Sequence, residues 1–168
     1  FRSSGLYIGG TATTSGGTGR VTVTGGGSLS VLTGTLKLWN AGTLTIGSGG
    51  SVTVRSFNKS VGTLRFSGGT LTVSGGTFTH AAGSGTFANI LTLDGIGSPL
   101  LQFTQGASVV GAEATVIGVT NSGQLLISGG SVLTNTGSPV ALGGVGGWGI
   151  NRGRSYLGLL AGSTGTAT

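Results

Sequence analysis

The sequence predicts an all-β protein: a right-handed parallel β-helix, or β-solenoid, whose short strands wind into roughly three-sided rungs of about 22 residues. Two observations support this prediction. A sequence motif of two short strands around a glycine turn recurs along the chain, and apolar residues alternate with hydroxyl residues within each strand. Such a unit cannot bury its apolar face alone, so its copies must stack on one another.

The repeated motif predicts the strand positions and the length of a rung. Copies begin at Gly19, Gly42 and Gly62, so their spacing is about 22 residues, and a fourth copy begins at Gly123. Strands of four or five residues joined by short glycine turns place three strands in this length. We predict strands centred near Val21, Leu29, Leu36, Leu44, Val52, Leu64, Leu71 and Phe78.

The glycine corners favour parallel winding over the alternative, an antiparallel β-sandwich. Two-residue hairpins in antiparallel sheets prefer Asn-Gly or Asp-Gly. This chain instead repeats Gly-Gly-Ser or Gly-Gly-Thr, at Gly49–Ser51, Gly68–Thr70 and Gly129–Ser131. Glycine at such a corner supplies a positive φ and lets adjacent rungs approach closely.

The later part of the chain continues the pattern less regularly. Strands are predicted within 87–93, 100–103 and 114–119. We assign residues 1–137 to the solenoid repeats, and residues 138–168 to a glycine-rich connection that begins a further repeat of the same solenoid. Tyr156-Leu-Gly is similar to Tyr7-Ile-Gly, which indicates a longer period of about 150 residues above the short one.

Composition excludes several classes of function. The chain has 39 glycines, but the alternation within its strands argues against disorder. The net charge of +6 reflects two acidic residues against eight scattered basic ones, so no nucleic-acid partner is expected. The absence of cysteine excludes disulfides and thiolate metal sites. No apolar run approaches the ~20 residues of a membrane helix, so membrane insertion by this segment is not expected.

The ionisable residues are too few for catalysis or for a metal site. Asp94 and Glu113 are the only acids and lie 19 positions apart, which is close to one rung. Like charges on adjacent rungs repel, and we predict a structural turn role for Asp94-Gly95. His80 is the only histidine and lacks the partners of a triad or a metal site. We therefore expect a protein that is not an enzyme, with no catalytic or metal residues and no cofactor.

Two short motif matches carry little weight in a sequence of this composition. Gly144–Gly149 fits the Gly-x-Gly-x-x-Gly fingerprint, but neither a βαβ unit nor a following acid supports a dinucleotide site. Asn58-Lys-Ser60 fits a glycosylation sequon. Glycine-rich calcium rolls need repeated aspartates, which this chain lacks.

Three stretches of the first half, Gly34–Asn40, Gly42–Val54 and Ser67–Phe78, share short Thr-Leu or Val-Thr-Val strands set between glycines. These stretches resemble the autotransporter-associated β-strand repeats of bacterial surface proteins, over about residues 5 to 80. The resemblance implies a secreted, extracellular or cell-surface β-helical stalk used for adhesion, biofilm matrix or filament building. It implies no catalytic residues.

From these observations we predict a structural extracellular protein that is part of a stalk or assembles end to end into filaments. Uncapped solenoid ends expose unpaired strand edges, which promote self-association unless a longer chain continues the stack. The alternative is an adhesin that binds glycan through its Thr/Ser face or through Trp39, Trp148, Tyr7 and Tyr156. A remote alternative is a polysaccharide lyase or hydrolase, which the shortage of acids disfavours.

Overall fold

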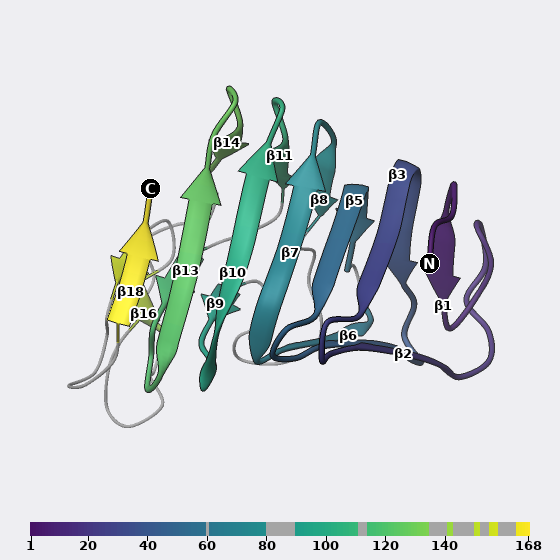
Figure 1. Ribbon diagram of the computed structural model, residues 1–168, viewed down its shortest axis with the longest axis horizontal. Coiled ribbons are helices and arrows are strands. Elements are labelled where there is room, and N and C mark those ends of the chain that lie inside the picture. Colours follow the sequence, from purple (N-terminus) through teal and green to yellow (C-terminus); the bar gives the residue numbers. More distant parts are fainter. Residues whose placement is uncertain are drawn as a thin grey trace.

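The chain forms an all-β structure, as its alternating sequence predicts. The computed structural model describes residues 1–59, 61–79, 90–110, 114–134, 141–142, 150–151, 155–157 and 164–168. Within these ranges there is no helix, and most strands run parallel in a curled, half-barrel sheet (Figure 1).

The strand positions agree closely with the predicted ones. The first half of the chain contains β1 (Leu6–Ile8), β2 (Gly19–Val23), β3 (Ser28–Leu38), β4 (Gly42–Ile46), β5 (Ser51–Asn58), β6 (Thr63–Phe66), β7 (Gly68–Ser74) and β8 (Thr77–Thr79). The second half contains β9 (Ile90–Leu93), β10 (Gly97–Thr104), β11 (Ser108–Val110), β12 (Ala114–Ile117), β13 (Ser122–Ile127), β14 (Val132–Leu133), β15 (Ala141–Leu142), β16 (Ile150–Asn151), β17 (Ser155–Leu157) and β18 (Thr164–Ala167). Every strand centre predicted from Val21 to Phe78 falls inside one of these elements, although Leu29 and Leu36 share β3.

The strands stack into parallel ladders. The front ladder contains β3, β5, β7, β10, β13 and β18, which lie side by side in chain order (Figure 1). A second ladder of β8, β11 and β14 stacks on the end of β5. β2, β4 and β6 form a third ladder, and β9, β12 and β17 form a fourth. Among the described strands only β15 and β16 pair antiparallel, so the sandwich alternative does not describe these ladders.

The register of the front ladder gives the spacing of the stack. Leu29 pairs with Val52 and Val52 with Leu71, at separations of 23 and 19 residues, which fit the predicted spacing of about 22. Leu71 then pairs with Leu101, 30 residues further on, and Leu101 pairs with Leu125 after another 24. One apolar position is thus repeated at each step along the ladder.

One apolar core runs through the stack. Among the described residues it contains 22 buried apolar side chains, and all four ladders contribute to it. The Phe57 and Phe78 rings stack with 5.2 Å between centroids, and Phe78 meets Phe103 edge-on at 5.7 Å. All three rings are fully buried. Aromatic pairs of this geometry contribute about 0.5–1.5 kcal/mol beyond the burial of their area, so the rings strengthen the contact between successive strands.

Stacked glycine turns build the corner that joins the third ladder to the front ladder. The N–H groups of Gly25 and Gly26 donate to the carbonyl oxygens of Ser48 and Gly49 at 2.9 and 3.0 Å. Gly49 and Gly69 have φ angles of 71° and 73°, a region that favours glycine. A Cβ atom at Gly69 would collide with backbone carbonyl oxygens of the preceding turn. Positive φ and close approach, the two predicted reasons for glycine at these corners, are confirmed.

Some elements differ from the sequence-based prediction or extend it. β11 was not indicated by the repeat, and β15 and β16 pair inside the segment predicted as a glycine-rich connection. β1, which contains Tyr7, pairs with β3, whereas β17, which contains Tyr156, pairs with β12 in another ladder. The two similar segments therefore do not occupy equivalent places, and their pairing gives the predicted longer period no support. The strand predicted over 87–93 is described from Ile90 onward.

Alanine substitutions at three glycines separate the two reasons for glycine at a corner, the positive φ and the lack of room for a Cβ atom. Gly69 combines a positive φ with a backbone contact, Gly106 has a positive φ of 76° in open space, and Gly16 has open space alone. We expect Gly16→Ala to change the free energy of unfolding by less than about 0.5 kcal/mol, and Gly106→Ala to reduce it by about 1 kcal/mol. Gly69→Ala should reduce it by about 3 kcal/mol or more. Urea unfolding followed by circular dichroism measures all three, and equal losses at Gly69 and Gly106 would contradict the packing argument.

Candidate functional site

Asp94 accepts hydrogen bonds from a turn that lies one rung further along the chain. It follows β9 directly, and the turn, residues 119–121, follows β12. Its Oδ1 atom accepts the backbone N–H groups of Val119, Thr120 and Asn121 at 3.0, 3.1 and 2.8 Å. Its Oδ2 atom accepts the Thr120 hydroxyl at 3.0 Å and the Asn121 side-chain amide at 3.4 Å. The carboxylate thus ties together the ends of two stacked strands.

Two opposing effects set the pKa of Asp94. Partial burial raises the pKa of the carboxyl, whereas the hydrogen bonds from Asn121, Thr120 and Val119 lower it. The hydrogen bonds together outweigh burial, so the pKa lies below its usual value. A carboxylate that is held charged, with both oxygens occupied, is suited to fix a turn rather than to transfer protons near neutral pH.

Other residues considered for chemistry lie outside the described part of the chain. These are Glu113, His80, Ser60 of the sequon and the Gly144–Gly149 segment. In the described ranges, no three His, Cys, Asp or Glu side chains are grouped so that they could hold a metal ion. The same ranges contain no helix of the length and apolarity that crossing a membrane requires.

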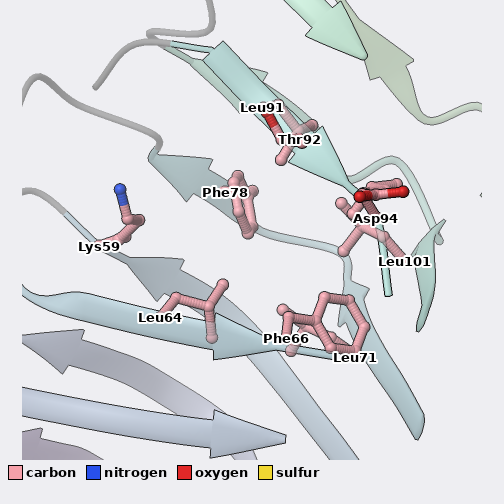
Figure 2. A pocket seen from close by; sticks show the side chains of 10 residues that line it. Lys59, Leu64, Phe66, Leu71, Phe78, Leu91, Thr92, Asp94 and Leu101 are labelled. Carbon is pink, nitrogen blue, oxygen red and sulfur yellow. The ribbon is translucent and has the colours of Figure 1, made fainter. Parts of the chain in front are cut away.

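A cavity of about 320 Å³ lies beside Asp94 (Figure 2). Leu64 and Phe66 of β6 and Leu91 of β9 line it. The apolar core residues Leu71, Phe78, Leu93 and Leu101 also contribute to its lining. Figure 2 shows Lys59 and Asp94 on opposite sides of these apolar side chains. Thr92 lines it as well, so the cavity combines an apolar floor with polar and charged groups around it.

Lys59 is a partly buried amine at this cavity. It lies in the loop between β5 and β6. Burial lowers the pKa of the Lys59 amine below its usual value. Within the described residues no carboxylate forms an ion pair with Lys59, so its charge is left without a protein counter-ion there.

Trp39, one of the residues proposed for glycan binding, is engaged by its own chain. Its indole N–H donates to the carbonyl oxygen of Thr11 at 2.7 Å, and the Lys37 ammonium lies 3.5 Å from the ring centroid. Tyr7 is 39% exposed and pairs in register with Lys37, so two of the four predicted aromatic residues lie close together. Trp148 is outside the described residues, and Tyr156 is located only as part of β17. Lys37 covers one face of the Trp39 ring, which leaves less of it for stacking on a sugar.

The N-terminal end of the stack is open at its interior. Phe1 is 75% exposed and, together with Leu6, Val21 and Leu29, lines an opening of about 380 Å³. Among the described strands β2 pairs only with β4, so its other edge carries no ladder partner there. This end therefore presents an apolar interior next to a free strand edge.

Comparisons of this chain with protein-family models, with curated proteins and with solved structures found no match. The resemblance to autotransporter-associated repeats therefore stays a prediction from the residues alone.

Lys59 is not indicated as a site residue by the sequence, in which it stands as the middle of the Asn58-Lys-Ser60 sequon. The reason is that the cavity arises between β6 and β9, which are far apart in the sequence. A lone lysine that ends an alternating strand, without an acid nearby in the sequence, is the only local signal. The sequence predicted a structural turn role for Asp94-Gly95, but not the hydrogen bonds that Asp94 accepts from residues 25 to 27 positions away.

Replacement of Asp94 should make part of the stability independent of pH. The folded-state pKa is depressed, so the unfolded chain binds more protons at acidic pH. The contribution of Asp94 is therefore complete above the ordinary pKa of 3.8 and is lost as the pH falls through the folded-state pKa. At pH 7 we expect Asp94→Asn to reduce the free energy of unfolding by about 1–2 kcal/mol, allowing for solvent screening at this partly exposed site.

Urea unfolding of both proteins between pH 7 and pH 2 tests this expectation. The difference between wild type and Asp94→Asn should shrink towards the acidic end. A difference that stays constant over the whole range would contradict the assigned role of the carboxylate.

Proposed function

We propose that this chain is a non-enzymatic structural protein, a right-handed parallel β-helix with three-sided rungs that forms a stalk or assembles end to end into filaments. The extracellular or cell-surface location that we propose with it rests on the repeat resemblance alone. The proposal is carried by one observation: parallel ladders end in an open interior and a free strand edge at the N-terminal end.

The order of the strands supports the helical winding. The chain passes from the third ladder at β4 to the front ladder at the start of β5, and then to the second ladder at the end of β5. It repeats this order with β6, β7 and β8, each of which pairs with the corresponding part of β4 or β5. Three sides visited in the same order on successive turns are the arrangement of a three-sided coil.

The open end supports continuation of the stack. A free edge offers unpaired N–H and C=O groups at the strand spacing of ~4.8 Å, which is a template for another parallel strand. The partly buried Val21 and the exposed Phe1 would be removed from water by such a strand. Burial of apolar area contributes about 25 cal/mol per Å², so a covering rung, from the same chain or from a second copy, is favoured.

The alternatives have less support. An adhesin would use aromatic side chains, and Trp39 is already engaged by Thr11 and Lys37. A polysaccharide lyase or hydrolase would use paired acids, and Asp94 is committed to a turn. We therefore keep the adhesin as the second candidate, resting on the Thr/Ser outer face, and do not propose the enzyme.

Self-association of the purified chain tests the filament form of the proposal. We expect sedimentation velocity to show an average molecular mass that increases with protein concentration. Negative-stain images should show particles elongated along the stack. Val21→Glu should reduce the association constant about tenfold or more, because it places an unpaired charge at the covered interior. Thr63→Glu, at an exposed position of β6 in the same ladder and away from this opening, is the matched control and should change association less than about twofold.

Circular dichroism first establishes that both variants are folded. A wild-type chain that stays monomeric at every concentration tested would contradict end-to-end assembly. Equal effects of the two substitutions would show that association does not use this end.

A further inference from the structure

The pairing between successive rungs fails on one side of the stack. β7 pairs with β10 in the front ladder, and β8 pairs with β11 in the second. β6 and β9, which precede β7 and β10 in the chain, are not paired with each other; they end two separate ladders. One side of the stack is therefore interrupted while the other two continue.

The gap between β6 and β9 closes at one end, at the corner that leads into β7 and β10. At this corner the N–H group of Gly97 donates to the carbonyl oxygen of Ser67 at 3.0 Å, and a Cβ atom at Gly95 would collide with Ser67. Away from this corner, β6 and β9 are separated by the cavity, which Leu64, Phe66 and Leu91 line. The gap between the ladders is thus a wedge that narrows towards the corner.

The cavity has the size and lining of a site for a small ligand. Its volume of about 320 Å³ is at the lower end of the range for ligand pockets, about 300–1,000 Å³. Its floor is the apolar core, at Leu71, Phe78 and Leu101, and these side chains are 0–1% exposed. An apolar chain or ring placed there would lie against side chains that the ladders hold in fixed positions.

The two charged groups of the cavity differ in what they can bind. Asp94 has both oxygens occupied by hydrogen bonds from Val119, Thr120 and Asn121. Lys59 has no carboxylate partner in the described part of the chain, and burial disfavours its charge. An anion beside the Lys59 ammonium would restore the interaction that burial removes. The charge of Asp94 would repel an anion at the opposite side, which orients the ligand.

We propose that this cavity binds a small amphipathic carboxylate, with its apolar chain against Leu64, Phe66 and Leu91 and its carboxylate at the Nζ atom of Lys59. This inference is independent of the stalk or filament function, because the cavity lies on the side of the stack and not at its end. It assigns the site a ligand class but no reaction.

Titration with octanoate and with octanol separates the charge from the apolar chain. Isothermal titration calorimetry at pH 7 should give saturable binding of octanoate, about tenfold tighter than that of octanol. Lys59→Met keeps an unbranched apolar side chain and should remove this difference while octanol binding persists. Lys37→Met changes the only other lysine of the chain and should leave the difference intact.

A second measurement needs no variant. Reductive methylation with ¹³C-formaldehyde labels the lysines, and NMR then follows the pKa of Lys59. We expect this pKa to lie below its usual value in the free protein and to rise when octanoate is added. Octanol should not raise it.

Three results would overturn the proposal. They are equal affinities for octanoate and octanol, absence of saturable binding at millimolar octanoate, and a pKa of Lys59 that octanoate does not raise. Loss of self-association in Val21→Glu with retained octanoate binding would concern the filament alone, so the two proposals fail separately.

Discussion

Parallel, in-register stacking of strands is the constraint on which the rest of this structure depends. Each inward position of one rung must sit above an inward position of the next, as Leu29, Val52 and Leu71 do. Because the backbone hydrogen bonds fix the rung spacing at ~4.8 Å, the side chains cannot move apart to relieve a poor fit. The same spacing brings corner turns against one another, and Gly69 has no room for a side chain. Apolar alternation and glycine corners are therefore two consequences of one geometric demand.

The constraint leaves few positions for chemistry. Among the described residues, inward positions are apolar apart from the buried Thr115, and outward positions on the strands are mostly Ser and Thr, which suit a pleated, solvated surface. In the described part of the chain, charged side chains lie on the exterior or in loops, and two of them contact other parts of the stack. Asp94 binds the turn of the next rung, and Lys37 lies over Trp39. These positions favour an extended surface over a catalytic centre, and on that ground we propose a structural role.

The sequence predicted the regular part of this fold because that part is local. A period of two within strands and about 22 between copies was enough to locate the strands from Val21 to Phe78 and to choose parallel pairing. The elements it missed depend on contacts that no short pattern reports. β11 has only three residues, and β15 and β16 pair outside the ladders. The partners of Asp94 and the cavity at Lys59 likewise require residues about one rung or more apart to meet.

The break in the repeat is where a specific binding site becomes possible for a stack of this kind. A uniform ladder has a filled interior and identical neighbours, so no rung differs enough from the next to select a ligand. Between β7 and β10 the separation of paired residues rises to 30, from 19 at the preceding step, and on the same step β6 and β9 lose their pairing. That step also carries the apolar cavity, a lysine without a described counter-ion and one of the chain's two acids. The regular rungs hold the walls in place, and the irregular step supplies the space and the charge.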